Sequence, residues 1–192
     1  EDGNRLEELR RERTESFTTL VQQIVGQRDK YAELIGVFAS EKTVVLSDLD
    51  FLAELKFDSR GLLLSAQDVL DNRQVEVMGN ERARSVFEEL LGLYGAVLEG
   101  QTARIPDLVR ETDRLAAALR SKVKGSQAIT AGNLYKALYG TYLTVTPVVM
   151  YKKTRLSKLS LGQKATVLMK IYLAQGTDPI VIDSHDDHLD NE

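Results

Sequence analysis

The sequence of 192 residues has no cysteine and no tryptophan, and it contains only three prolines and two histidines. The lack of cysteine excludes a disulfide-bonded scaffold and fits a cytoplasmic chain. No apolar run approaches the ~20 residues that cross a bilayer, so no membrane partner is expected. The hydrophobic share of 43% excludes a disordered tail and predicts a folded globular protein.

The net charge is also small, because 29 acidic residues nearly balance 25 basic ones and leave a formal net charge of −4. That balance argues against a basic nucleic-acid-binding module. Six of the acids, together with both histidines, lie between Gln175 and Glu192, where there is no lysine or arginine. Residues 1–174 hold the other 23 acids and all 25 bases, a net charge of +2. The acidity is therefore a local feature of the C-terminal segment.

The two ends of the sequence are those expected of a fragment. The chain begins at Glu1 instead of methionine, without a signal-peptide pattern, and it stops at Glu192 inside a dense run of polar residues. We therefore expect it to be part of a longer protein.

Residues 5–39 have the spacing of one long helix. Apolar residues recur at alternating intervals of three and four, with one polar exception, at Phe17, Leu20, Ile24, Gln27, Tyr31, Leu34 and Phe38. Leu6 and Leu9 extend this seam with a slip in register near Arg13. Two interpretations remain open, an amphipathic helix packed on its own domain and the base of a coiled-coil arm. We assign residues 1–39 to an arm base and residues 40–192 to the domain that follows it.

Two stretches have the pattern of β-strands. Within residues 44–58, apolar residues alternate with charged ones over Leu49–Phe57, which is typical of a half-buried strand. Residues 141–151 are rich in β-branched and aromatic residues, and Pro147 restricts them to an edge strand or an interrupted one.

The remaining middle segments favour helices. They are predicted at residues 62–71, 81–99, 106–122 and 133–139. Pro106 suits a first helical turn, and we expect Gly125 and Gly132 to bracket a loop. Helices and strands together predict an α/β fold.

The most informative stretch begins at Leu159 with the residues LSLGQ. Ser160 followed three residues later by Gln163 is a capping box, which predicts a helix of about 15 residues ending at Gly176. Gly162 lets another molecule approach the backbone closely. The unpaired N–H groups of such a helix start favour an anion such as phosphate.

A short apolar run, Pro179–Ile182, follows and ends in Asp183. This pattern predicts a buried strand with a carboxylate at its C-terminal tip, the edge where α/β sheets bind ligands. A carboxylate in that position is suited to hold Mg²⁺ beside a nucleotide phosphate.

Taken together, these segments resemble the second half of an ABC-type (P-loop) ATPase head. Leu159–Gln163 resemble the signature motif, Ile180–Asp183 the Walker B strand, and Leu189 and Asp190 the end of the D-loop. The interval of twenty residues from Gln163 to Asp183 matches the family. The heptad helix and the strand after it make the chain similar to the structural-maintenance-of-chromosomes, RecF and RecN class. More narrowly, IVIDSHDDHLDN is similar to a motif of the TrlF-like bacterial coiled-coil ATPases.

The resemblance implies that two heads sandwich ATP between them. Ser160 and Gly162 of one head would meet the γ-phosphate held by the phosphate loop of its partner, and Leu161 and Gln163 would belong to the same cofactor-binding motif. Asp183 would hold Mg²⁺ in its own head, and Asp190, also counted as cofactor-binding, would communicate across the dimer. The implied partners are a second copy of the head, an N-terminal part carrying the phosphate loop, and DNA.

Two departures from the family pattern bear on activity. No GxxxxGK[ST] motif occurs, so ATP hydrolysis is expected only in the full-length dimer, and these residues alone should be inactive. The glutamate that usually follows the Walker B aspartate is replaced by Ser184, which leaves Asp186 or His185 as candidate catalytic bases.

Two functions therefore stay open. The first is an ATP-hydrolysing ATPase that acts with DNA in repair, chromosome organisation or phage defence. The second is an ATP-gated dimerisation module with little hydrolysis, which controls an attached nuclease or phosphoesterase.

Two clusters near the motif have alternative interpretations as well. The Asp and His residues between Asp183 and Asp190 are suitable ligands for an independent divalent metal. The bases on either side of the signature would contact nucleotide or DNA phosphates, or simply form a solvated loop. They are Lys152, Lys153, Arg155, Lys158 and Lys164.

Overall fold

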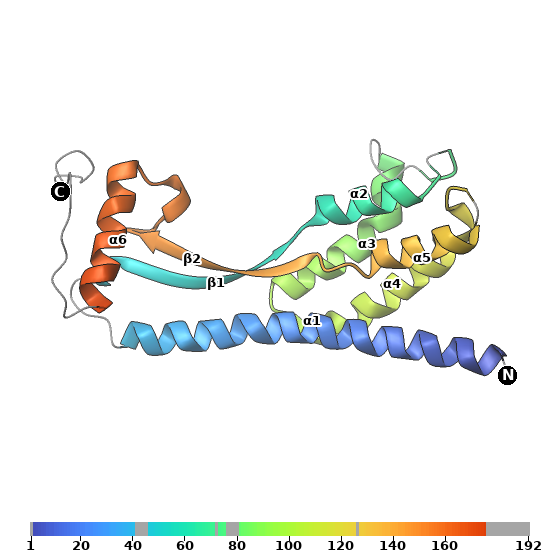
Figure 1. Cartoon of the computed structure of the whole chain (residues 1–192), viewed down its shortest axis with the longest axis horizontal. Helices are drawn as coiled ribbons and strands as arrows, with labels where there is room; N and C mark the ends of the chain where they lie inside the picture. Colours follow the sequence, from blue (N-terminus) through green and yellow to red (C-terminus); the bar gives the residue numbers. More distant parts are fainter. Residues whose placement is uncertain (1, 41–45, 72, 76–80, 126, 176–192) are drawn as a thin grey trace. The chain divides into compact units, whose positions relative to one another are not determined.

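A computed structural model describes residues 2–40, 46–71, 73–75, 81–125 and 127–175 (Figure 1). The protein is a mixed α/β structure, mostly helical, with a long N-terminal helix and a small antiparallel sheet of three strands in the order β1-β2-β3. The α/β prediction is confirmed at this level.

The elements follow one another along the chain in a simple order. The helices are α1 (Asp2–Ser40), α2 (Ser59–Val69), α3 (Glu81–Leu98), α4 (Ile105–Leu119), α5 (Gln127–Leu138) and α6 (Leu161–Gln175). The strands are β1 (Leu49–Phe57), β2 (Leu143–Tyr151) and β3 (Thr154–Arg155). Short 3-10 helices are η2 (Thr102–Arg104), η3 (Arg120–Lys122) and η4 (Leu156–Lys158).

The chain divides into two compact units, each with its own core. The helical unit contains the residues up to Gly26 together with Leu55–Val145. The hairpin unit contains Gln27–Glu54 and the described residues from Thr146 onward. Helix α1 and strands β1 and β2 each contribute residues to both units.

The core of the helical unit forms where α1 packs against its own domain. Phe17, Val21 and Val25 of α1 are almost fully buried, at one-turn intervals. On α3, Tyr94 is also buried, and its ring stacks on Phe57 with the ring centroids 4.1 Å apart. The first half of α1 is therefore an amphipathic helix of its own domain.

The second half of α1 leaves its apolar seam exposed. Tyr31 is 39% exposed and Leu34 is 64% exposed, both at positions of the predicted heptad seam. Near the start of the helix, Leu6 and Leu9 are exposed as well. The long helix is confirmed, and the coiled-coil arm stays a prediction that these exposed positions favour.

Arg13 accounts for the slip in the apolar register of α1. Its guanidinium lies 4.3 Å from the ring centre of Tyr135 and 4.9 Å from that of Tyr139, in cation–π contact with both. It also forms an ion pair of 2.5 Å with Asp113 of α4. A charged residue thus takes an inward position because two aromatic rings and a carboxylate compensate it there.

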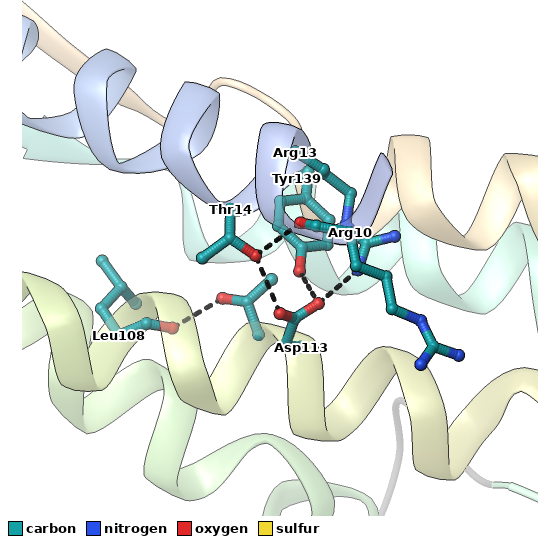
Figure 2. A network of polar contacts seen from close by, with 7 residues as sticks. Arg10, Arg13, Thr14, Leu108, Asp113 and Tyr139 are labelled. Carbon is teal, nitrogen blue, oxygen red and sulfur yellow. Dashed lines mark hydrogen bonds and ion pairs between the residues drawn. The ribbon is translucent and has the colours of Figure 1, made fainter. Parts of the chain in front are cut away.

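Asp113 joins three segments through one carboxylate (Figure 2). Besides Arg13, it accepts a hydrogen bond of 3.0 Å from the Thr14 hydroxyl and another from the Tyr139 hydroxyl, just after α5. Burial alone would raise the pKa of the Asp113 carboxyl. The hydrogen bonds from Tyr139, Arg13 and Thr14, with the charge of Arg13, outweigh burial and hold that pKa below its ordinary value. The network therefore favours the ionised form.

Helix α5 corrects the predicted loop between Gly125 and Gly132, because α5 begins at Gln127 and passes through Gly132. Leu134 and Leu138, one turn apart, are completely buried. Their burial outweighs the roughly 1 kcal/mol that glycine costs inside a helix. Only Gly125, with a φ of 72°, keeps the turn conformation that was expected.

Strand β2 accommodates Pro147 because β3 is so short. The register pairs Met150 with Arg155 and Tyr151 with Thr154, so β3 does not reach Pro147. At Pro147, β2 is therefore an edge strand on the side where β3 lies. A proline, which has no N–H to donate, is accommodated at such an edge.

We predict opposite effects for two glycine substitutions in the helical unit. Gly140→Ala should destabilise it by about 1–3 kcal/mol, because the new Cβ would lie 2.9 Å from Cζ of Tyr142. That ring cannot easily yield, since its hydroxyl donates to the Ala137 carbonyl oxygen at 2.6 Å. Gly132→Ala should stabilise by up to about 1 kcal/mol, because the residue is helical and, apart from its own helix backbone, no atom of the described residues lies within 4 Å of the new Cβ. Urea unfolding followed by circular dichroism measures the change in unfolding free energy of each variant. Changes of the same sign would contradict the packing described.

We also predict that Asp113→Asn destabilises the protein in a pH-dependent manner. At pH 7 the loss should be about 1–2 kcal/mol, a value discounted for screening because the side chain is 35% exposed. Since the folded state lowers the pKa of Asp113, its contribution is present above the unfolded pKa of ~3.9 and is lost as pH falls through the lower folded value.

Urea midpoints at pH 7 and pH 3 test the second prediction. The difference between wild type and Asp113→Asn should shrink at pH 3. Glu88→Gln, an exposed acid on α3, is the control and should change stability by less than ~0.5 kcal/mol at both pH values. A difference that persists unchanged at pH 3 would exclude the ionised carboxylate as its source.

Candidate functional site

The start of α6 carries the capping box that the sequence predicts. The backbone N–H of Gln163 donates to Ser160 Oγ at 3.1 Å, and the backbone N–H of Ser160 donates to Gln163 Oε1 at 3.2 Å. The N–H of Lys164 bonds to the Ser160 carbonyl oxygen at 3.0 Å and continues the helix. Both halves of the box are formed, so each of the two N–H groups is satisfied by the other residue's side chain, as the sequence predicts.

The same helix start presents groups that suit an anion. In the described part of the chain, no acceptor is recorded for the N–H groups of Leu161 and Gly162. Ser160 is exposed, and its hydroxyl hydrogen remains available because Oγ acts as an acceptor in the box. These donors lie at the positive end of the helix dipole, an arrangement that fits phosphate oxygens.

Apolar contacts hold α6 in the hairpin unit. Val167 is completely buried, and Leu159, just before the helix, is 7% exposed. They pack with Leu46, Leu49 and Tyr151 in a small second core. Since Leu159 belongs to this core, the residue directly before Ser160 is fixed to the hairpin.

Two ion pairs add to this attachment. Lys170 Nζ lies 2.5 Å from Asp48 Oδ2 and 5.3 Å from the centre of the Tyr151 ring. Arg155 in β3 forms a bidentate pair with Glu54 in β1, at 2.9 and 2.5 Å. The first pair ties the middle of α6 to the residue before β1, and the second ties β3 to β1, so that helix and hairpin form one supported unit.

The structure brings together four of the predicted site residues. Ser160 directly precedes α6, and the first turn of the helix contains Leu161, Gly162 and Gln163. Leu161 is 68% exposed. The predicted residues Asp183, His185, Asp186 and Asp190 lie outside the described residues. Within the described ranges no group of three or more His, Asp or Glu residues is placed to hold a metal ion.

Sequence reasoning missed Asp48, Lys170 and Tyr151 as supports of the helix start. Asp48 and Lys170 are separated by 122 positions, and neither belongs to a recognisable motif. The only available signal was Lys170 itself, a base among the apolar residues of α6.

Comparisons with protein-family models, with curated proteins and with solved structures find no match for this chain. The search of the described helices for a long, apolar segment of membrane-spanning length also finds none.

We predict that the Asp48–Lys170 pair stabilises the hairpin unit by coupling. Lys170→Met and Asp48→Asn should each cost about 1 kcal/mol, and the double variant should cost less than their sum by about 0.5–1 kcal/mol. The sign follows because each single change leaves the other charge partly buried, with the side chains 27% and 23% exposed.

Urea unfolding of the four proteins gives the coupling energy directly. Lys164→Met, on the same helix and without an ion pair among the described residues, is the control and should have little effect. Strictly additive losses would mean that the two side chains do not interact in solution.

Proposed function

We propose that this chain is the C-terminal part of an ABC-type ATPase head of the structural-maintenance-of-chromosomes, RecF and RecN class. One observation carries the proposal. The residues LSLGQ form a helix start with both capping-box bonds, in which Ser160 and Leu161 are exposed and the Leu161 and Gly162 N–H groups lie at the tip. Such a start is suited to the γ-phosphate of an ATP molecule held by a second head.

ATP and Mg²⁺ are the proposed cofactors. Bound ATP would supply the γ-phosphate whose hydrolysis drives such heads. The Ser160 hydroxyl and the Leu161 and Gly162 N–H groups would orient its oxygens. Asp183 is the proposed Mg²⁺ ligand, Asp190 the proposed contact across the dimer, and Asp186 or His185 the proposed base for the attacking water.

The proposed partners follow from the same assignment. A second head would complete the site, and an N-terminal part of the protein would supply the phosphate loop. DNA is the proposed substrate on which the dimer acts, and the cytoplasm is the proposed location. Tyr31 and Leu34, exposed on the second half of α1, support the proposed arm, because a neighbouring helix would bury them.

A second function has one specific observation in its favour. Ser184 stands where the family has the glutamate that polarises water, and serine is not a base near neutral pH. In this version, ATP holds two heads together with little turnover, and dimerisation controls an attached nuclease or phosphoesterase.

We predict that Gly162→Asp abolishes ATP-dependent dimerisation of the full-length protein. The carboxylate would repel the phosphate, whereas an aspartate in the first turn of a helix favours folding. Ser157→Asp is the matched control, because it adds the same charge in η4 before the helix and should leave dimerisation intact. Analytical ultracentrifugation with and without Mg-ATP measures the effect, and dimers formed equally by both variants would contradict the proposed contact.

The 192-residue chain alone should bind ATP only weakly, because it has no phosphate loop. Micromolar affinity in calorimetry would refute the assignment as half of a site. Steady-state turnover of the full-length protein separates the two functions. ATPase activity that falls in Asp183→Asn and Asp186→Asn supports the ATP-hydrolysing enzyme. No turnover in the wild type excludes that function and supports the ATP-gated dimerisation module.

A further inference from the structure

Some buried polar side-chain atoms of the described residues have no recorded hydrogen-bond partner. They are Arg13 Nε, Asp48 Oδ1 and Tyr94 Oη. Arg13 and Asp48 each form an ion pair through another atom of the same side chain, so their burial is partly compensated. Tyr94 has only its hydroxyl, and a buried hydroxyl without a partner destabilises the folded state. Of these groups, Tyr94 therefore has the strongest requirement for a partner.

The Tyr94 hydroxyl is held inside the helical unit as a hydrogen-bond donor. Tyr94 is 1% exposed, and its ring stacks on Phe57 of β1 with only 12° between the two planes. This stack holds the ring in place, so the hydroxyl cannot turn outward to bulk solvent. Burial raises the pKa of the Tyr94 hydroxyl, and the proximity of Tyr142 raises it further. The group therefore keeps its proton near neutral pH and needs an acceptor for it.

A small cavity lies beside Tyr94. Apolar side chains of α1, among them Phe17 and Ile24, form one wall, and Tyr94 together with residues 140–143 forms the rest. The space in which the centre of a water-sized sphere can lie is about 10 Å³. A single water molecule needs roughly 10–15 Å³ by this measure. The cavity therefore has room for one water molecule and for nothing larger.

Polar groups also line this cavity. The Tyr142 hydroxyl donates to the Ala137 carbonyl oxygen at 2.6 Å, which leaves its oxygen free to accept from another donor. The backbone N–H and C=O groups of Gly140 and Thr141 have no hydrogen bond recorded within the described part of the chain. A buried water molecule is typically held by two to four polar partners. Tyr94, Tyr142 and the backbone at Gly140 and Thr141 supply enough of them.

We propose that this cavity is a binding site for one water molecule, which accepts the hydrogen bond of the Tyr94 hydroxyl and links it to Tyr142 and to the backbone at Gly140 and Thr141. Water suits the site because it accepts from one group and donates to another at the same time. An apolar occupant would leave the Tyr94 hydroxyl unpaired. The bound water joins α3 to the segment between α5 and β2, directly below α1.

This inference concerns the helical unit and goes beyond the proposed function. It requires neither ATP nor a second head, and it can be tested on the 192-residue chain. Its outcome leaves the ATPase assignment unaffected.

The first test locates the water directly. A crystal structure of the chain at about 1.5 Å resolution should show an ordered water about 2.5–3.0 Å from Tyr94 Oη. A cavity without such density would overturn the proposal. A direct hydrogen bond from the Tyr94 hydroxyl to a protein acceptor would also overturn it, because the water would then have no role.

The second test compares the same chemical change at a buried and at an exposed tyrosine. Tyr94→Phe keeps the stacked ring but loses the hydrogen bond to water, so the thermal midpoint should fall by about 2–4 °C. Tyr31→Phe, at a residue 39% exposed on α1, is the control and should shift the midpoint by less than ~1 °C.

The opposite result is expected if the cavity is dry. Tyr94→Phe would then remove an unpaired buried hydroxyl, and the thermal midpoint would rise. A midpoint that rises or stays unchanged in Tyr94→Phe would therefore overturn the proposal.

The third test examines the link through the water to Tyr142. Tyr142→Phe also removes the bond to Ala137, so it is read only in a double-mutant cycle with Tyr94→Phe. The double variant should lose less in thermal midpoint than the sum of the two single losses, because both hydroxyls bind the same water. Strictly additive losses would overturn the proposed link.

Discussion

The Asp113 carboxylate is the contact on which the placement of α1 depends. It receives hydrogen bonds from Arg13 and Thr14 of α1 and from Tyr139 after α5, while its own backbone belongs to α4. A single apolar stripe would allow α1 to slide by a turn against its neighbours. A charged group with three directional partners does not, so the register in which Phe17, Val21 and Val25 enter the core is defined.

In the hairpin unit, too, charged contacts supplement the apolar packing. Among the described residues its second core contains five buried side chains, and two ion pairs supplement it. Both acids of these pairs come from the chain before β2, whereas both bases come from the chain after it. The charged contacts that support this unit therefore join segments far apart in the sequence.

Periodic and capped segments were predictable from the sequence because their causes are local. The spacing of residues 5–39 and the alternation over Leu49–Phe57 each express contacts within one element, and both elements were found. The reciprocal bonds of Ser160 and Gln163 likewise depend on residues three positions apart. Gly132 misled the sequence analysis, because a glycine suggests a break and the buried Leu134 and Leu138 that oppose one are only visible after packing.

The sequence by itself determined the long helix, strands β1 and β2, the capped start of α6 and the motif that resembles an ATPase signature. Only the tertiary structure decided that Arg13 is an inward residue and that Asp48 supports Lys170. The physical reason is distance along the chain. Caps and periodicity act over one to four residues, whereas the Arg13–Asp113 and Asp48–Lys170 pairs join residues 100 and 122 positions apart.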